Sequence, residues 1–298
     1  MDWRARLAEY LPPRRARVDA ALEAYLTGAP SMPRVLLEAM RYATLGAGKR
    51  LRPILCIAAA EAVGSDIEQV IPTACALELI HAFSLVHDDL PAIDNDRLRR
   101  GQPTVWVRYG ETLAILAGDA LFAKAFELIA VQAQFSPPDR VVQTLRLIAE
   151  AVGASGMCGG QVEDILNEGQ VVSEETLRFI HAHKTGALIR ASVLSGAILA
   201  GADSVAVDAL NVYSRAVGIA FQITDDILDE IASTEQMGKP AGSDRARRKA
   251  TYTALFGVET ARIHAQRALQ DALDALEQFD SYAEPLRWLA YYAVERDR

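Results

Sequence analysis

Two short segments concentrate carboxylates directly after apolar runs. His87 to Asp96 reads HDDLPAIDND and follows HAFSLV, and Ile219 to Glu230 reads IAFQITDDILDE. Carboxylates at the ends of buried helices are unfavourable unless they are paired or bind a metal. One acidic cluster alone is usually a solvated surface. Two clusters in the same setting favour a site for a divalent cation.

The second acidic segment has helical spacing. Asp225 and Asp229 are four positions apart, so on a helix they share a face, where like charges repel. At the C-terminal end of a helix they also oppose the helix dipole. A bound Mg²⁺ removes both penalties, because it takes one or two carboxylates and completes its shell with water and phosphate oxygens.

The first acidic segment contains a proline. Asp88 and Asp94 are six positions apart, about 120° out of phase on a regular helix. Pro91 disfavours helical geometry at Leu90. We therefore expect the helix to end here and the chain to loop, which returns Asp94 towards Asp88.

Basic residues gather in four other segments, GAGKRLRP, DRLRRG, HAHKTGALIR and MGKPAGSDRARRKATY. Arginine and lysine beside metal-binding acids suit a diphosphate, because they donate charge-assisted hydrogen bonds to its oxygens. Each group alone is typical of surface charge. There is no G-x-x-x-x-G-K-[ST] motif, so the chain is not a P-loop protein.

Apolar residues recur at helical spacing along most of the chain, and no convincing series of strands is present. The segment Leu188 to Leu199 is apolar on most sides, which is typical of a central helix. We predict an all-α fold in which residues 1–298 form one large domain, with central helices wrapped by amphipathic ones. The predicted helices include 112–131, 141–152, 174–199, 205–228 and 260–279.

Composition excludes several classes of protein. The net charge of −8 does not suit nucleic-acid binding through phosphate contacts. Cys56, Cys75 and Cys158 are far apart in sequence, which favours a reducing cytosol over a disulfide framework. The longest apolar stretches are too short to span a bilayer, and the charged N-terminal stretch is not typical of a signal peptide. We expect a cytoplasmic protein.

With both acidic segments in their settings, the sequence resembles the trans-isoprenyl diphosphate synthases, most of all the bacterial farnesyl diphosphate synthases. The resemblance runs from GAGKRLRP to the C-terminal YAVER, and includes GDALF, MCGGQVEDI, FQITDDILD and GKPAGSD. It implies a bundle of long helices around a deep central cavity, usually as a homodimer. The implied reaction is the condensation of isopentenyl diphosphate with dimethylallyl or geranyl diphosphate, which yields farnesyl diphosphate and pyrophosphate.

The resemblance also implies roles for single residues. Three Mg²⁺ ions are expected on Asp88, Asp94 and Asp225, with Asp89, Asp226 and Asp229 in support. The residues implied for the allylic diphosphate are Arg99, Lys184, Thr185, Gln222, Lys239 and Lys249, and those for isopentenyl diphosphate are Lys49, Arg52, His81 and Arg100. By spacing alone, His81 and Gln222 are ordinary helix residues.

Phe83 lies five positions before Asp88, deeper along the same helix. From spacing alone it fits the core as well as a binding tunnel. Related farnesyl diphosphate synthases carry an aromatic residue at this position, so the resemblance implies that Phe83 closes the tunnel and limits the product to fifteen carbons.

Some residues depart from the family pattern. Asn95 and Arg97 stand where relatives often have acids, and Arg248 and Thr253 replace a common glycine and proline. The alternatives are a geranylgeranyl or geranyl diphosphate synthase, a terpene cyclase, and a non-catalytic partner subunit. Cyclases usually carry a different second motif and partner subunits typically lose one, whereas both motifs are intact here.

Overall fold

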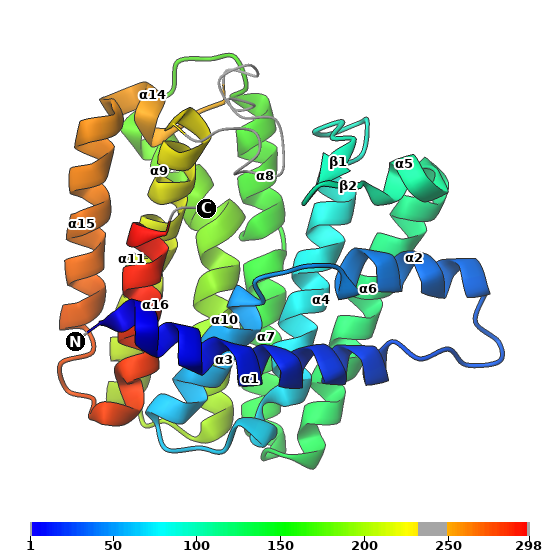
Figure 1. Cartoon of the computed structure of the whole chain (residues 1–298), viewed down its shortest axis with the longest axis horizontal. Coiled ribbons are helices and arrows are strands. Elements are labelled where there is room, and N and C mark those ends of the chain that lie inside the picture. The colour runs from blue at the N-terminus through cyan, green and yellow to red at the C-terminus, as the bar shows by residue number, and fades with distance from the viewer. Residues whose placement is uncertain (1, 232–248, 297–298) are drawn as a thin grey trace.

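The computed structural model describes residues 2–231 and 249–296, and it is built almost entirely of helices (Figure 1). The N-terminal half contains α1 (Trp3–Tyr25), α2 (Arg34–Leu45), α3 (Leu51–Ala62), η1 (Ile67–Gln69), α4 (Ile71–Asp88), α5 (Val105–Tyr109), α6 (Glu111–Val131), η2 (Gln132–Gln134) and α7 (Pro138–Val152). The remainder contains α8 (Met157–Leu166), α9 (Glu174–His181), η3 (Ala182–Gly186), α10 (Ala187–Ala200), α11 (Ser204–Ile231), α14 (Tyr252–Phe256), α15 (Val258–Asp274), η4 (Ser281–Ala283) and α16 (Glu284–Glu295). The all-α prediction is confirmed.

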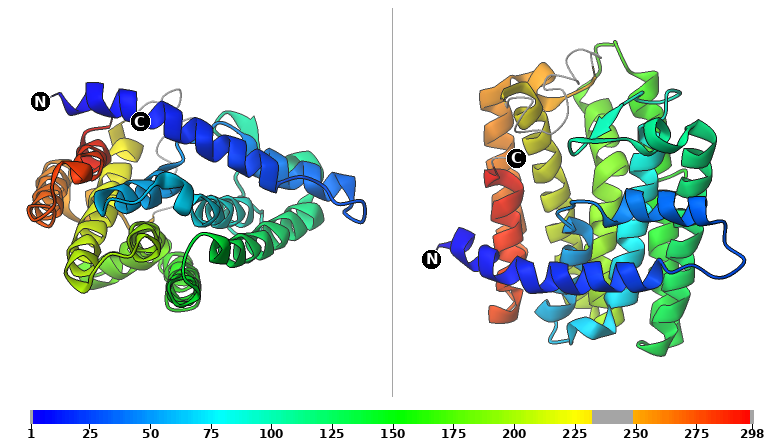
Figure 2. Two further views of the ribbon diagram at one scale, coloured as in Figure 1. Left: turned by 90° about the horizontal axis from the view of Figure 1, so that it is seen from below. Right: turned by 45° about the vertical axis from the view of Figure 1, so that its right-hand side comes forward.

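The long helices of the bundle run side by side, and α1 and α2 lie across them (Figures 1 and 2). α4 packs against α6, and α10 packs against α3, α7 and α11. The prediction of a central helix is confirmed, because α10 is buried over most of its length, from Leu188 to Leu199. Burial of these apolar faces supplies the main driving force for folding.

Two helices differ from their predicted bounds. The segment predicted as one helix over 174–199 is α9 and α10 joined by a π-helical turn, η3. The helix predicted over 260–279 ends at Asp274. The Arg287 guanidinium of α16 donates to the carbonyls of Leu276 (2.7 Å) and Phe279 (2.9 Å), so backbone oxygens beyond that end are satisfied without further helix.

A small β-hairpin follows the first acidic segment. β1 (Leu98–Arg99) pairs antiparallel with β2 (Gln102–Pro103). Arg100 and Gly101 connect them with φ of 53° and 74°, the backbone of a two-residue turn that matches strand twist. The carbonyl of Asp96 accepts hydrogen bonds from Thr104 (2.9 Å) and Trp106 (2.8 Å), which holds the base of the hairpin against α5.

Within the described residues, no helix is both long enough and apolar enough to cross a membrane. Cys56, Cys75 and Cys158 are free thiols, the first two of them buried.

Candidate active site

The chain turns back on itself directly after α4. α4 ends at Asp88, and the backbone N–H of Asp94 donates to the carbonyl of Asp88 at 2.8 Å. The N–H of Asn95 closes a second bond to Leu90 at 2.9 Å. Asn95 has a φ of 53°, which asparagine tolerates better than most residues. The expected loop is therefore present.

The two carboxyls at the end of α4 lie in unlike surroundings. Burial raises the pKa of Asp88, and nearby Asp94 adds to this rise, while Lys184 acts in the opposite direction. Burial also raises the pKa of Asp89, to about 6. The Arg99 guanidinium binds both oxygens of Asp89, at distances of 2.7–3.0 Å. An added cation stabilises the charged form of a carboxyl with a raised pKa such as Asp88.

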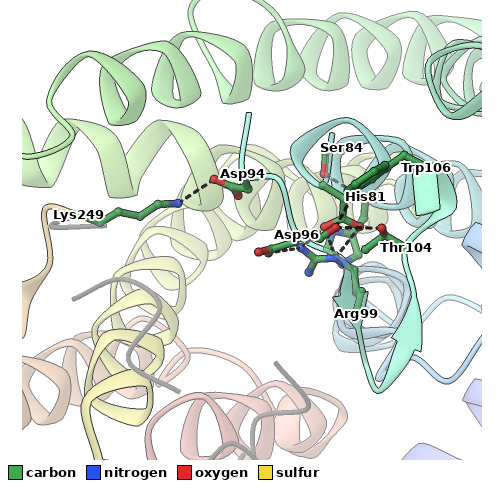
Figure 3. A network of polar contacts seen from close by, with 9 residues as sticks. His81, Ser84, Asp94, Asp96, Arg99, Thr104, Trp106 and Lys249 are labelled. Carbon is green, nitrogen blue, oxygen red and sulfur yellow. Dashed lines mark hydrogen bonds and ion pairs between the residues drawn. The ribbon is translucent and has the colours of Figure 1, made fainter. Parts of the chain in front are cut away.

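Lysines from two distant segments meet beside this loop. Lys249 contacts Asp94 at 3.2 Å, and the close-up shows the two side chains pointing toward one another (Figure 3). Lys184 contacts Asp164 of α8 at 2.6 Å, and Lys249 lies 3.7 Å from the same carboxylate. Sequence reasoning assigned no role to Asp164, although it lies in the quoted MCGGQVEDI segment.

Lys184 and Thr185 lie within the π-helical turn η3. Such turns are rare and occur frequently at functional sites. The turn packs tightly on α8, because a Cβ added to Gly160 would lie only 2.2 Å from the backbone nitrogen of Lys184. A glycine at position 160 therefore lets η3 approach and places Lys184 beside the acidic loop.

The second acidic segment lies near the end of α11. Asp225 accepts from the Arg296 guanidinium at 2.6 Å. Asp226 is buried and accepts from Gln222 (3.0 Å) and from the backbone N–H of Tyr252 (2.7 Å), which joins α11 to α14. Asp229 is also buried. The contacts of Lys249 and Tyr252 thus link both acidic segments at one end of the bundle (Figure 1).

A basic cluster lies around His81. Burial and the charges of Arg52, Arg100, Arg99 and Arg50 hold the pKa of His81 well below its usual range. Burial lowers the pKa of Arg52 to about 10, and its Nε has no hydrogen-bond partner within the described part of the chain. Lys49 lies over the ring of Tyr292 at 5.8 Å. Apart from Lys49, the residues assigned to isopentenyl diphosphate thus lie around His81.

Phe83 is partly buried on α4. Its ring lies 4.8 Å from that of Phe122 on α6, and Phe126 follows at 4.9 Å from Phe122. Sequence reasoning identified the first member of this aromatic row. The other two come from a helix distant in sequence, and a repeat of two phenylalanines four positions apart was the available signal.

Of the residues that depart from the family pattern, Asn95, Arg97 and Thr253 lie within the described part of the chain. Arg97 is exposed and stacks over Trp106 at 5.2 Å. Thr253 lies in the first turn of α14, whose N-terminal end is capped by the hydroxyl of Thr251. Lys239 and Arg248 lie outside the described residues.

The donor chemistry of the site fits Mg²⁺. Among residues 2–231 and 249–296, no three acidic, histidine or cysteine side chains converge into a complete metal site. Mg²⁺ does not need one, since it is commonly held by one or two carboxylates plus substrate phosphates. The carboxylates of Asp88, Asp94 and Asp225 are donors of this kind.

Comparison with known proteins agrees with this geometry. Residues 33–284 match the family model described as Polyprenyl synthetase. The chain is 49% identical over 291 residues to a dimethylallyltranstransferase of Fischerella ambigua, covering 97% of this chain and 84% of that protein. It is 48% identical to a geranylgeranyl diphosphate synthase of Cyanophora paradoxa, covering 89% of each.

A solved structure is also similar to this chain in fold and in sequence. The apo FPP/GFPP synthase of Zymomonas mobilis superposes with a TM-score of 0.87 at 36% identity, covering 97% of this chain and 99% of that one. The match to the family model and the identity to the curated relatives both extend over most of the chain. The chain therefore belongs to the polyprenyl synthetase family of prenyltransferases.

Proposed function

We propose that this prenyltransferase condenses isopentenyl diphosphate with dimethylallyl or geranyl diphosphate, with Mg²⁺ as cofactor. The observation that carries the proposal is the hairpin after the acidic loop. Arg99 of this hairpin binds Asp89, and the charges of Arg99 and Arg100 both act on His81, so the hairpin connects the acidic loop to the basic cluster. Two diphosphates can thus be held next to each other, one at the acidic loop and one at the basic cluster.

The residues of the acidic side, that is, of the acidic loop and the end of α11 with the cations beside them, can stabilise a departing diphosphate. When bound to Asp88, Asp94 and Asp225, Mg²⁺ supplies positive charge for the leaving group. Lys184, Lys249 and Arg99 add fixed cations, and we assign the same role to Lys239. Thr185 and Gln222 complete the allylic side. Electrostatic stabilisation of this kind is commonly the largest contribution to catalysis.

The basic cluster holds the second substrate. Arg52, His81, Arg100 and Lys49 bind the isopentenyl diphosphate, which keeps its diphosphate through the reaction. The C–O bond of the allylic diphosphate ionises to an allylic cation and a diphosphate anion, the double bond of isopentenyl diphosphate attacks this cation, and a proton is then lost to the departed diphosphate. No side chain acts as a nucleophile, and exclusion of water protects the cation.

We further propose that the product is farnesyl diphosphate, because the aromatic row of Phe83, Phe122 and Phe126 lies deeper along α4 and α6 than the acidic loop. Each additional five-carbon unit would gain roughly 4 kcal/mol on burial at about 0.8 kcal/mol per apolar carbon, so growth stops only where side chains block it. The relative from Cyanophora paradoxa is a geranylgeranyl diphosphate synthase, which favours a twenty-carbon product as the second candidate.

Product analysis decides between these lengths. The purified chain is incubated with Mg²⁺, isopentenyl diphosphate and one allylic starter at a time, and the dephosphorylated products are separated by chromatography. Farnesol from both dimethylallyl and geranyl diphosphate supports the proposal. Geranylgeraniol as the main product supports the second candidate, and the absence of any prenyl alcohol longer than the starter contradicts both.

We also infer that residues 1–298 act as one domain, supported by the stacking of Trp3 on Tyr291 at 6.0 Å, which ties the N-terminal helix to α16. A homodimer is supported by exposed apolar side chains such as Leu116 on α6 and Val142 on α7. A cytoplasmic location is supported by the free thiols. Light scattering coupled to gel filtration tests the dimer, and a mass near 32 kDa, that of one chain, would contradict it.

A further inference from the structure

Glu78 is a buried carboxylate that the proposed chemistry does not use. It lies within α4, whose neighbouring residues are almost all apolar, and its side chain is 4% exposed. It precedes His81 by three positions, so the two share a face of the helix. A charge buried in this way is strongly unfavourable unless it is paired.

The partner of Glu78 is Arg50. The guanidinium of Arg50 contacts Glu78 at 2.7 Å, Asp19 of α1 at 2.7 Å and the carbonyl of Gly46 at 3.1 Å. Arg50 has a left-handed backbone with a φ of 55° at the start of α3, a conformation that non-glycine residues rarely adopt. These contacts fix the turn over residues 46–50, which carries Lys49 and leads directly into Arg52.

The same turn crowds guanidinium groups together. A Cβ added to Gly48 would lie 2.8 Å from Nη1 of Arg50 and 2.9 Å from Nη1 of Arg100. The negative charge of Glu78 stabilises the charged forms of both Arg52 and Arg100. The charge of Arg100 acts against that of Arg52, and the charge of Arg50 acts against that of Arg100, because nearby like charges repel. Glu78 is therefore placed to offset the repulsion among these arginines.

We propose that Glu78 is a positioning residue of the isopentenyl diphosphate site: it anchors Arg50 and thereby the 46–50 turn, and it keeps Arg52 and Arg100 gathered around His81. This inference rests on the proposed function, because it assumes that the basic cluster binds isopentenyl diphosphate. Glu78 does not itself touch the substrate, since two anions would repel.

Initial-rate kinetics of Glu78→Gln test the proposal, because the amide keeps the shape and removes the charge. The KM for isopentenyl diphosphate should rise by about tenfold or more, on the scale of breaking a buried charge pair. The KM for the allylic diphosphate should stay within about twofold, since the acidic side keeps its own cations. Glu78→Asp, which restores the charge, should recover part of the loss.

Glu61→Gln is the matched control. Glu61 is also a poorly exposed carboxylate on an arginine, Arg14, but it lies at the opposite end of α3 from Arg52. Its substitution should lower the melting temperature and leave both KM values unchanged. If Glu78→Gln does the same, or raises both KM values equally, Glu78 is only a structural residue and the proposal is wrong.

A second variant covers the case in which Glu78→Gln does not fold. The double variant Glu78→Gln/Arg50→Met removes both charges of the pair, a change that often leaves the folded protein stable. The turn over residues 46–50 then has no anchor. The KM of this variant for isopentenyl diphosphate should remain raised, and a normal value would overturn the proposal. Failure of the proposed function itself is distinguishable, because the unmodified chain would then form no product at all.

Discussion

The backbone N–H of Asp94 donates a 2.8 Å hydrogen bond to the carbonyl of Asp88. Together with the bond from the N–H of Asn95 to the carbonyl of Leu90, it closes the loop that returns the second acid of the motif to the end of α4. The carboxylate of Asp94 then meets Lys249 at 3.2 Å, from a segment more than 150 positions away in sequence. The acidic loop is thus connected to both halves of the chain.

The metal-binding aspartates should matter for turnover more than for folding. Asp88→Ala, Asp94→Ala and Asp225→Ala should each reduce kcat by at least about 100-fold, as loss of a major transition-state stabiliser does. Asp88→Ala should keep or raise the melting temperature measured without Mg²⁺, because burial disfavours its charged form. Asp208→Ala, an exposed change on α11, is the control for both measurements. Normal turnover in any of the three variants would show that the residue is not part of the metal site.

The two basic groups should divide between the two substrates. Arg52→Ala and Lys49→Ala should raise mainly the KM for isopentenyl diphosphate, because Arg52 has a buried Nε without a protein partner in the described structure. Arg99→Ala and Lys239→Ala should raise mainly the KM for the allylic substrate. Initial rates with each substrate varied in turn give the four constants. The reverse pattern would mean that the assignment of the two sites is exchanged.

The length of the product should depend on the aromatic row. Phe83→Ala should shift the product to twenty carbons or longer while the initial condensation survives, because it removes the ring nearest the acidic loop. Phe122→Ala should lengthen the product as well, since its ring lies 4.8 Å from Phe83. Phe135→Ala, at a position that is 46% exposed, is the control and should leave the product unchanged.

Chromatography of the dephosphorylated products measures this shift. If both variants on the row keep the product of the unmodified chain, the end of the tunnel lies elsewhere. Loss of the fold in Phe83→Ala, seen by circular dichroism, would instead identify Phe83 as an ordinary core residue.

His81 should stay neutral at pH values well below those at which a histidine usually takes up a proton. Burial and the surrounding arginines lower its pKa in the folded protein, whereas the unfolded chain takes up a proton near pH 6.5. The contribution of His81 to stability is therefore complete above about pH 6.5 and is lost as the pH falls towards the lowered pKa, by at most about 1.4 kcal/mol per pH unit. His81→Gln should show a shallower loss of unfolding free energy over this range. A His81 ring resonance that titrates by NMR near pH 6.5 would contradict this prediction.

Much of this site could be predicted from local sequence. The proline in HDDLPAIDND indicated that α4 must end, and the spacing of Asp225 and Asp229 indicated a shared helix face. The π-helical turn that carries Lys184 could not be predicted, because hydrophobic periodicity does not distinguish it from an α-helix. The turn packs closely against Gly160 of α8, a tertiary contact that the local sequence does not reveal.

Pairs between distant segments also escaped sequence reasoning. Arg50 with Glu78 and Arg296 with Asp225 are separated by 28 and 71 positions. A charged residue inside an apolar helix was visible at Glu78, but its partner depends on how α3 and α4 pack. Asp164 was visible only as part of a motif, since its role follows from two lysines that the fold brings together.

The most direct test of Mg²⁺-dependent condensation is to follow pyrophosphate release under four conditions. These are both substrates with Mg²⁺, each substrate alone with Mg²⁺, and both substrates with EDTA in excess. Substantial release is expected only with both substrates and Mg²⁺, in a one-to-one ratio with the carbon–carbon bonds formed, and added Mg²⁺ should restore it after EDTA. Rapid release from the allylic substrate alone would indicate a cyclase, and equal release with EDTA would contradict the metal-dependent mechanism.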